Sequence, residues 1–429
     1  MRLIYLILVC FAAPVATAIA WLRGLRDPSR RERLADRWGR PAIRSDLNSA
    51  ETIWVHAASV GEVQAGAGLV RRLLRQSSNS RIVMTTMTAT GAARVTSLFG
   101  DRVTHCFLPY DIPFAVRGFL VRAQPKLALI LETELWPNLL RECRRQRLPV
   151  VIANARISPR TAARYRRFAA LFKEELVGDV AIAAQTPDDA ERFRQLGATN
   201  VQVVGNVKFD IEIPDNVRQA GVELLRLVGG RFVWVAGSTH EGEEVAALQA
   251  HRQLLAIVPT ALLILAPRHP QRFDEVKKRL AQSGLSFVTR SSGVAPTTAA
   301  IWLIDTLGEL LQCYAVCDAA FVGGSLVAVG GHNLLEPAAV GVPILAGPHL
   351  SSTQDSADLL IDAGALSIVR SADALADALI ELSRDAQLRA GVGALGKQVV
   401  SENRGAEERV MLLVAQGCAS TTGTATSVS

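Results

Sequence analysis

The sequence predicts an α/β protein: two Rossmann-like, doubly wound domains that face each other across a cleft, plus an N-terminal membrane-anchor helix. Three observations support this fold class. The length of 429 residues suits two domains of ordinary size. In both halves, short apolar runs rich in β-branched residues alternate with helical stretches, as expected for parallel strands buried on both faces. The two halves also open alike, with WVHAASVGEV at 54–63 and WVAGSTHEGEE at 234–244.

The composition is that of a folded protein with reduced thiols. Hydrophobic residues make up 49% of the chain and charged residues 20%, which excludes a disordered chain. The six cysteines are scattered, with no CxxC pair and no Cys/His cluster at zinc spacing. We therefore expect free thiols and a cytosolic setting.

The first element is an apolar N-terminal run. Residues 3–22 form 20 uncharged residues, about the length that crosses the hydrocarbon core of a bilayer. Pro14 would kink such a helix, and Ala16 and Ala18 leave a cleaved signal peptide as the alternative. A single arginine before the run and many arginines after it favour an anchor over export. By the positive-inside rule, the rest of the chain then lies on the cytoplasmic side.

The positive charge of the chain is concentrated in two stretches. Residues 23–44, within a juxtamembrane segment 23–50, hold eight arginines against three acids, and residues 141–167 hold nine arginines against one acid. Such patches are typical of contact with an anionic surface. Because aromatic residues are only 5% of the chain and no nucleic-acid-binding motif occurs, we expect a membrane surface or a phosphorylated lipid and no nucleic acid.

The predicted strands divide the body of the chain into two domains. In the first, 51–212, the apolar runs are 52–56, 81–87, 126–132, 149–155, 180–185 and 201–206. Pro214 and mixed charge then predict a linker at 213–222. In the second domain, 223–415, the runs are 231–238, 261–269, 285–290, 300–305, 318–324, 342–347 and 365–370. The low-complexity end, 416–429, is predicted to be disordered.

Polar residues gather where the predicted strands end, which is where doubly wound sheets bind ligands. In the first domain, Glu62 follows a strand and is placed to act as a general base that takes a proton from a hydroxyl. A carboxylate at a helix N-terminus is expected to be ionised. The alternative for Ser59-x-x-Glu62 is a capping box with no catalytic role.

Two further strand ends of the first domain carry charged residues. Glu132 and Glu134 end one strand, and their mutual repulsion is a cost that a fold alone would not need; the alternative is a solvated acidic loop. Lys208 ends another strand, with a surface ion pair as the alternative. If Glu132 and Lys208 meet in the cleft, they would orient the substrate or balance charge in the transition state.

The second domain offers groups suited to an anion. Arg268 and His269 follow a strand, and a guanidinium fits phosphate and carboxylate. Two glycine pairs within 321–333 precede a helix, where the backbone can approach a phosphate. Asn333-x-x-Glu336 is a further capping pattern, with Glu336 placed to accept ribose hydroxyls. No GxGxxG follows the first strand of either domain, and neither a P-loop nor a DxD metal motif occurs, so we expect no metal and no cofactor.

Several segments together resemble one family. IWVHAASVGEV, LETELWPNLL, GNVKFD, LAPRHPQRF and GGHNLLEPAAVGVPILAGPH are similar to the lipid A-specific 3-deoxy-D-manno-octulosonic acid (Kdo) transferases of Gram-negative bacteria, a likeness that runs from about residue 3 to about residue 410. The resemblance implies a GT-B glycosyltransferase of the inner membrane. It also implies CMP-Kdo as donor, the tetraacyldisaccharide bisphosphate precursor of lipid A (lipid IVA) as acceptor, and inversion at the sugar.

The resemblance also implies roles for single residues. Glu62 matches the catalytic base of the family, and Glu132 and Lys208 match the residues that stabilise the transition state. The positions that match the CMP-binding segments are Pro267, Arg268, Leu307, Gly308, Glu309, Asn333 and Glu336.

One loop departs from the family pattern, and two other functions stay open. After GPH the family shows an FNF-type stretch, whereas this chain has Leu350-Ser351-Ser352-Thr353, so contacts of that loop are not carried over. The first alternative function is another GT-B enzyme at the membrane, a UDP-sugar transferase or epimerase. The second is a membrane scaffold that kept the fold without catalysis.

Overall fold

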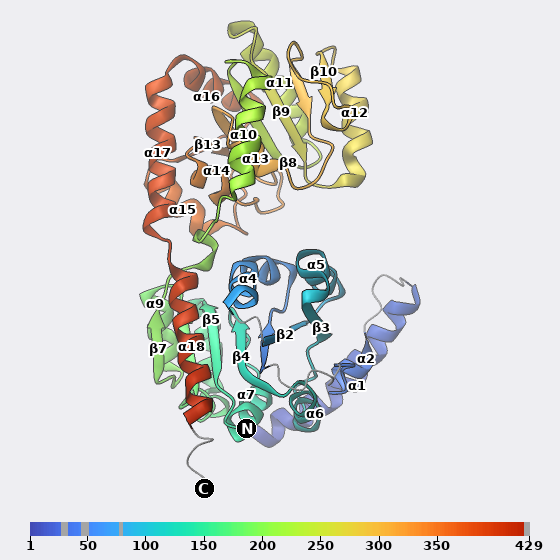
Figure 1. Ribbon diagram of the computed structural model, residues 1–429, viewed down its shortest axis with the longest axis vertical. Coiled ribbons are helices and arrows are strands. Elements are labelled where there is room, and N and C mark those ends of the chain that lie inside the picture. The colour runs from blue at the N-terminus through green and yellow to red at the C-terminus, as the bar shows by residue number, and fades with distance from the viewer. Residues whose placement is uncertain (27–32, 44–50, 77–79, 424–429) are drawn as a thin grey trace. The chain divides into compact units, whose positions relative to one another are not determined.

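The computed structural model describes residues 1–26, 33–43, 51–76 and 80–423 and divides the chain into two compact units. Unit 1 is Met1–Asp210 with Arg404–Ser429, and unit 2 is Ile211–Asn403. In each unit, helices cover both faces of one parallel sheet (Figure 1). The prediction of two doubly wound α/β domains is confirmed.

The sheet of unit 1 has seven strands in the order β3-β2-β1-β4-β5-β6-β7, so β1 lies at its centre. Every pairing is parallel. The strands are β1 Glu51–His56, β2 Ser80–Thr86, β3 Val103–Phe107, β4 Pro125–Leu131, β5 Val150–Ala155, β6 Val180–Ala184 and β7 Asn200–Val203. The sequence analysis missed β3, because Thr104 and His105 interrupt the apolar run that marks the other strands.

Four helices of unit 1 begin at capping residues that follow a strand. Ser59, Thr88, Ser158 and Thr186 each accept a hydrogen bond from a backbone N–H of the first helical turn. The helices are α1 Arg2–Arg26, α2 Leu34–Arg37, α3 Val60–Ala65, α4 Ala67–Gln76, α5 Ala89–Phe99, α6 Pro113–Ala123, α7 Pro137–Arg145, α8 Pro159–Arg167, α9 Pro187–Gln195 and α18 Ala406–Gly423, with 3₁₀ turns η2 Gly100–Arg102, η3 Ala169–Leu171 and η4 Val207–Phe209.

Unit 2 repeats the plan with seven strands in the order β10-β11-β9-β8-β12-β13-β14. They are β8 Val233–Thr239, β9 Leu262–Pro267, β10 Phe287–Thr289, β11 Ile301–Leu303, β12 Ala319–Val322, β13 Ile344–Ala346 and β14 Leu366–Ile368. The helices are α10 Asp215–Val228, α11 Glu243–Ile257, α12 Phe273–Gln282, α13 Leu310–Tyr314, α14 Leu335–Val340, α15 Gln354–Asp362, α16 Ala372–Arg384 and α17 Ala386–Glu402, with 3₁₀ turns η5 Pro270–Arg272 and η6 Arg290–Ser292.

The predicted linker at 213–222 is wrong, because α10 occupies most of it. Pro214 precedes this helix as its N-cap residue rather than marking an extended connection. Val217, Leu224 and Val228 of α10 are buried. The helix is therefore part of unit 2, and the division between the units falls earlier, after Asp210.

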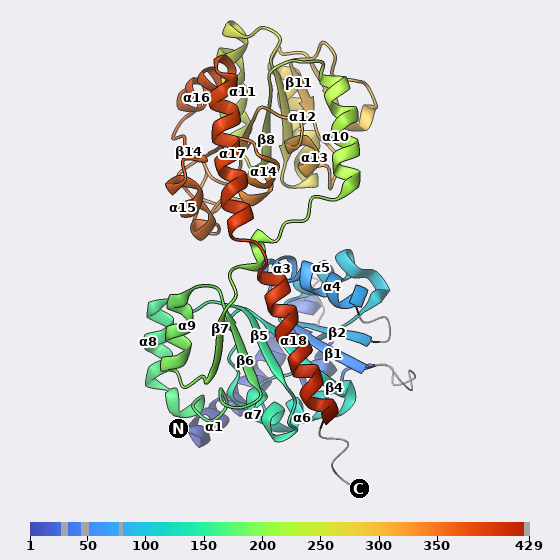
Figure 2. The same ribbon diagram turned by 60° about the vertical axis from the view of Figure 1, so that its left-hand side comes forward.

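The predicted C-terminal boundary is also wrong, because α18 returns to unit 1 (Figure 2). Ala406, Val410, Leu413 and Val414 are buried in the apolar cluster that covers one face of the unit 1 sheet. Their spacing of three and four residues places them on one side of the helix. The expected disordered tail, 416–429, is helical as far as Gly423, and 424–429 lie outside the described residues.

The predicted anchor helix, α1, exists and lies against unit 1. It is long and apolar enough to cross a membrane by length and composition, and most of its large apolar side chains are exposed. One side, however, contacts the start of α6 and the segment before it. Tyr5 Oη donates to Asp111 Oδ2 at 2.7 Å, Thr17 Oγ1 donates to Tyr110 Oη at 3.1 Å, and Ala13 is buried with Ile112.

Part of the arginine-rich sequence is structural rather than surface charge. Arg37 is buried and donates to the carbonyl oxygens of Met87 and Leu108 at 2.6 and 3.1 Å. In the second stretch, Arg145 pairs with the buried Glu142 at 3.0 Å. The expectation that these stretches serve an anionic surface therefore overstates the number of arginines available for it.

Candidate active site

Glu62 lies in the first turn of α3, directly after the central strand of unit 1. The Ser59 hydroxyl accepts from the Glu62 N–H at 3.3 Å and donates to Glu62 Oε1 at 3.2 Å. The Ala58 N–H donates to the other carboxylate oxygen. The N-cap half of the alternative interpretation, a capping box, is thus formed, and the Glu62 carboxylate accepts from the N–H of Ala58, one residue before the N-cap. These contacts fix the same carboxylate that is the candidate base.

The surroundings of Glu62 favour its protonated form. The pKa of Glu62 is raised to about 7, mostly by burial and also by the nearby charges of Glu132 and Glu134, against the hydrogen bonds from Ala58 and Ser59, which lower it. The carboxylate expected to be ionised at this helix N-terminus is therefore mostly ionised only above about pH 7, because burial raises its pKa. A pKa near 7 suits a general base at neutral pH, since the group can both hold and release a proton there.

Glu132 and Glu134 follow β4, the strand beside β1. Glu132 has a left-handed backbone with φ of 58°, which is costly for a residue with a side chain, and its N–H donates to the Ala153 carbonyl at 2.8 Å. Glu134 accepts a hydrogen bond from Trp136 Nε1 at 2.7 Å, and burial raises its pKa. The structure therefore brings these two carboxylates close enough to Glu62 to act on its charge.

Lys208 lies in η4 and its side chain is exposed. Asn154, at the end of β5, holds this turn: its Oδ1 accepts from the Val207 N–H at 3.2 Å. Asn154 is 1% exposed and has a left-handed φ of 56°. The turn that carries Lys208 is thus fixed to the strand next to the one that ends at Glu132, although no ion pair between Lys208 and Glu132 occurs in the described part of the chain.

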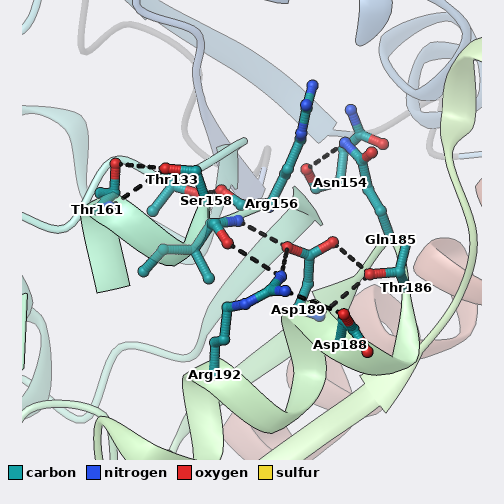
Figure 3. Close-up of polar contacts among 11 residues, drawn as sticks. Thr133, Asn154, Arg156, Ser158, Thr161, Gln185, Thr186, Asp188, Asp189 and Arg192 are labelled. Carbon is teal, nitrogen blue, oxygen red and sulfur yellow. Dashed lines mark hydrogen bonds and ion pairs between the residues drawn. The ribbon is translucent and has the colours of Figure 1, made fainter. Parts of the chain in front are cut away.

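A polar network secures the neighbouring loops of unit 1 (Figure 3). Asp189 accepts from the Ile157 N–H at 2.9 Å and from the Thr186 hydroxyl at 2.6 Å. Gln185 Nε2 donates to the Asn154 carbonyl at 3.1 Å. The loops after β5 and β6 are therefore tied to each other, and the side chain of Arg156 extends away from the network (Figure 3).

In unit 2, the first glycine pair does not form an open anion site. The buried carboxylate of Glu243 accepts from the backbone N–H groups of Gly324 at 2.7 Å, Ser325 at 3.0 Å and Leu326 at 2.9 Å. It also accepts from the His240 N–H at 2.9 Å. The expectation that these N–H groups hold a phosphate is wrong, because a side chain of the same unit already occupies them.

Three of the candidate nucleotide-binding residues of unit 2 lie together. Arg268 follows Pro267 at the end of β9 and is exposed. Asn333 Nδ2 donates to Glu336 Oε1 at 3.0 Å, and its Oδ1 accepts from the Leu335 N–H at 3.0 Å. Burial raises the pKa of Glu336, whereas the Asn333 hydrogen bond and the Arg268 charge lower it. The pattern Asn333-x-x-Glu336 therefore forms a hydrogen-bonded turn at the start of α14, beside a cation.

The second candidate segment, Leu307 to Glu309, lies after β11, the neighbour of β9. Leu307 is 71% exposed, and Gly308 has a left-handed φ of 86° with open space around it. Glu309 is already engaged, by Arg290 Nε at 2.7 Å and by the Thr306 hydroxyl at 2.5 Å. Among the described residues no hydrogen bond or ion pair joins this segment to Arg268, so the structure gathers only part of the predicted set.

The loop that departs from the family pattern packs on the second glycine pair. Leu350 is buried, and the Ser352 N–H donates to the Gly330 carbonyl at 2.9 Å. A Cβ on Gly330, whose φ is 110°, would lie 2.4 Å from the Ser352 hydroxyl. A glycine at 330 is therefore needed for this close approach.

The sequence analysis missed two residues at this edge of unit 2, His240 and His332. Their Nε2 atoms lie 2.8 Å apart, and the ring of His269 meets that of His240 edge-on. Burial lowers the pKa of His332 to about 4, with further lowering by Arg268, His240 and His269. The signal was weak because each histidine stands alone in its own segment. In the part of the chain that the structure describes, no group of His, Cys, Asp and Glu is arranged to hold a metal ion.

Comparisons with known sequences agree with the resemblance. The family model described as 3-deoxy-D-manno-octulosonic-acid transferase (kdotransferase) matches residues 32–211. The 3-deoxy-D-manno-octulosonic acid transferase of Haemophilus influenzae is 38% identical over 419 residues, which are 96% of this chain and 98% of the relative. That of Bordetella pertussis is 35% identical over 424 residues, with the same shares of 96% and 98%.

Comparison with solved structures shows the fold alone. The UDP-GlcNAc 2-epimerase of Neisseria meningitidis, bound to UDP-GlcNAc, is similar with a TM-score of 0.56 over 85% of this chain and all (100%) of that chain. Its sequence identity is 12%, which carries no conclusion about the reaction.

Proposed function

The chain belongs to the family of 3-deoxy-D-manno-octulosonic acid (Kdo) transferases, and from that premise we propose that it moves Kdo from CMP-Kdo to lipid IVA with inversion. It is a glycosyltransferase. In the proposed reaction an acceptor hydroxyl loses its proton to Glu62, and its oxygen forms a bond to the anomeric carbon of Kdo. The bond from that carbon to the phosphate oxygen breaks, and CMP leaves with the electron pair.

The observation that carries this proposal is the state of Glu62. The carboxylate stands at the end of the central strand, held by Ala58 and Ser59, with a pKa raised to about 7. A mere capping residue would gain nothing from the two further carboxylates, Glu132 and Glu134, whose charges oppose its ionisation. For a base, the same charges increase its affinity for the proton that it must take.

Charged groups near Glu62 in unit 1, and others in unit 2, have separate proposed roles. Glu132 and Lys208 would stabilise charge in the transition state, Lys208 as a cation on a turn fixed by Asn154. Arg268, Asn333 and Glu336 would bind CMP, the guanidinium at the phosphate and the carboxylate at a ribose hydroxyl. The remaining positions given by the family, Pro267 and Leu307 to Glu309, would line the same nucleotide.

The location proposed for this reaction is the cytoplasmic side of the inner membrane. The exposed apolar side chains of α1, such as Leu3, Leu8 and Phe11, would lie in lipid. The arginines at 23 and 26 at the end of this helix would stay on the cytoplasmic side. Lipid IVA would then reach the enzyme without leaving the bilayer.

Product analysis tests the proposed donor and acceptor. The full chain in detergent is incubated with lipid IVA and either CMP-Kdo or UDP-GlcNAc, and the mass of the lipid product is measured by mass spectrometry. We expect the mass of lipid IVA to rise by whole Kdo residues with CMP-Kdo alone, and the same spectrum gives their number. A hexosamine added from UDP-GlcNAc, or an unchanged lipid with CMP-Kdo, would contradict the proposal.

A further inference from the structure

The carboxyl edge of the unit 2 sheet carries three histidines that the proposed mechanism has not used. His240 follows β8, His269 follows β9, and His332 lies in the loop after β12, so they come from three neighbouring strands. The Nε2 atoms of His240 and His332 are 2.8 Å apart, with ring planes at 9°. This distance is that of a hydrogen bond, so one Nε2 carries a hydrogen and the other offers its lone pair.

The pair is held in place by the rest of unit 2. Glu243 fixes the His240 N–H and the turn at Gly324 with the same carboxylate oxygen, at 2.9 and 2.7 Å. Gly324 has a left-handed φ of 70°, and a Cβ there would lie 3.0 Å from the His332 ring. The glycine is therefore needed to let this ring lie against the backbone. A buried carboxylate and a glycine thus hold these two rings in place.

Two features beside the pair indicate a group that binds there. The hydroxyl of Thr239, the residue before His240, is buried and has no hydrogen-bond partner in the described part of the chain. Ser238 has a left-handed φ of 56°, a strain that folded proteins keep mainly at functional positions. Buried polar atoms without a partner are rare, and a ligand is one of the ordinary explanations.

The charges around the pair select an anion. Burial lowers the pKa of both rings most; Arg268 lowers that of His332 further and Arg272 that of His240, so a guanidinium lies near each ring. Glu243 and Glu244 raise the pKa of His240. However, the Glu243 carboxylate already accepts from backbone N–H groups, and Glu244 pairs with Arg272 at 2.6 Å. An incoming phosphate would meet Arg268 and two imidazoles, and the carboxylates of Glu243 and Glu244 are already engaged by other groups.

We propose that His240 and His332 bind the phosphate of the nucleotide donor, and that their mutual hydrogen bond opens when both Nε2 atoms donate to it. This inference rests on the proposed function, since it takes CMP as the leaving group. In the donor the phosphate is a diester with one negative charge. When the bond to Kdo breaks, the electron pair stays on the phosphate oxygen and the charge becomes −2. The histidines thus stand where charge grows during the reaction.

Binding of CMP is then coupled to a proton. Without the anion only one of the two Nε2 atoms carries a hydrogen, and with the anion both do. A shift of the hydrogen from Nδ1 to Nε2 would supply the second donor without a proton from solvent, whereas protonation of the ring would supply it with one. The anion favours protonation, because it stabilises the imidazolium. A unit charge about 4 Å away shifts a pKa by roughly 3 units at the effective dielectric of a protein surface. The phosphate dianion therefore raises the pKa of His332 from about 4 into the neutral range, and the pair takes up a proton from solvent.

Calorimetry of the full chain tests this coupling without any variant. CMP is titrated at pH 7.5, above its second pKa of about 6, in buffers of low and high ionisation enthalpy. The dependence of the observed heat on the buffer gives the number of protons taken up. We expect between about half a proton and one proton for CMP and none for cytidine, which has no phosphate. Equal proton counts for CMP and cytidine, or none for both, would overturn the inference.

Variants assign the proton to the pair. His332→Gln keeps a donor in place but cannot titrate, so the proton uptake should vanish and the dissociation constant of CMP should rise about 10- to 100-fold, the loss expected for one charge-assisted hydrogen bond. His349→Gln, at an exposed histidine of the same unit, should leave the proton count unchanged. If His332→Gln took up the same number of protons as the wild type, the inference would be overturned. CMP binding itself would still support CMP-Kdo as the donor. If the wild type bound no CMP at all, the proposed function would fail first.

Discussion

At the scale of single residues, the raised pKa of Glu62, the proposed base, predicts a pH dependence. Only the ionised carboxylate can take the acceptor proton, so kcat/KM for Kdo transfer should rise with pH through about 7 and level off above it. The measurement is the initial rate from pH 5.5 to 8.5 at low lipid IVA concentration. A rate that is already constant below pH 6 would contradict the assignment of the base.

The same raised pKa makes stability fall with rising pH, whereas activity should rise. Glu62 holds its proton more tightly in the folded state than in the unfolded chain. The protonated group therefore contributes stability that is fully present below about pH 4.5 and is lost as the pH rises through 7. Glu62→Gln, which mimics the protonated form, should therefore melt at a higher temperature than the wild type above pH 7 and at nearly the same temperature at pH 4.5. A difference in melting temperature that does not depend on pH would show that Glu62 does not titrate in this range.

Asn154 is the positioning residue whose role was not predicted. Asn154→Ala removes the acceptor of the buried Val207 N–H and should destabilise unit 1 by about 1–3 kcal/mol. Asn154→Gly removes the same acceptor but suits the left-handed backbone, so it should be about 1 kcal/mol more stable than the alanine variant. Both should lower Kdo transfer, because the turn of Lys208 is released. Full activity in both would separate Asn154 from the placement of Lys208.

Sequence reasoning at this scale found residues whose chemistry shows locally and missed those that depend on a partner. Glu62, Arg268 and Asn333 stand next to strands that the apolar runs mark. His240 and His332 are 92 positions apart, and only the fold reveals that their rings touch. The glycine turn at 323–324 has the sequence of an anion site, but Glu243, on another helix, fills it.

At the scale of elements, α18 shows why domain boundaries are hard to predict. Its apolar spacing indicates a helix with one buried side, but nothing in the spacing says which sheet it covers. The chain crosses back to unit 1 near Arg404, where the Asp210 carboxylate accepts from the N–H groups of Gly405 and Glu407 at 2.5 and 2.6 Å. Arg72 of α4 then pairs with Glu407 at 2.9 Å. Strand β3 was missed for a different reason: Thr104 and His105 make its sequence similar to that of a polar loop.

A matched pair of variants tests the place of α18. Leu413 is buried in unit 1 and its neighbour Leu412 is 58% exposed. Leu413→Ala should lower the free energy of unfolding by about 2–5 kcal/mol, whereas Leu412→Ala should stay within about 0.5 kcal/mol of the wild type. Hydrogen exchange should place the loss of protection in the strands of unit 1. Loss confined to unit 2 would contradict the boundary described above.

The helix α1 has two sides with different tasks. Deletion of residues 1–26 should release the protein from vesicles of anionic phospholipid in a flotation assay, because the exposed apolar side is removed. It should also lower the melting temperature, because Ile112 loses its cover and Asp111 loses the Tyr5 hydroxyl. Tyr5→Phe is the control, since it should keep vesicle binding and lose only stability. Unchanged melting in the deletion would mean that α1 does not pack on unit 1.

At the scale of the whole molecule, the two-domain architecture was predictable, because parallel strands buried on both faces appear in the sequence as short, regularly recurring apolar runs. The family followed from motifs spread over nearly the whole chain, and full-length relatives agree with it. The shared fold alone would not have sufficed, since an epimerase has it at 12% identity. In the proposed function, the reaction depends on the carboxylates, imidazoles and guanidinium groups at the carboxyl edges of the two sheets.

The most direct test of the account is Kdo transfer by Glu62→Gln. The amide keeps the size and the contact with Ser59 but cannot take a proton, so the rate from CMP-Kdo to lipid IVA should fall about 10²- to 10⁴-fold. Stabilisation by CMP, measured on the same sample, should remain and show that unit 2 is intact. If the variant transferred Kdo at a rate within a few-fold of the wild type, Glu62 would not be the base.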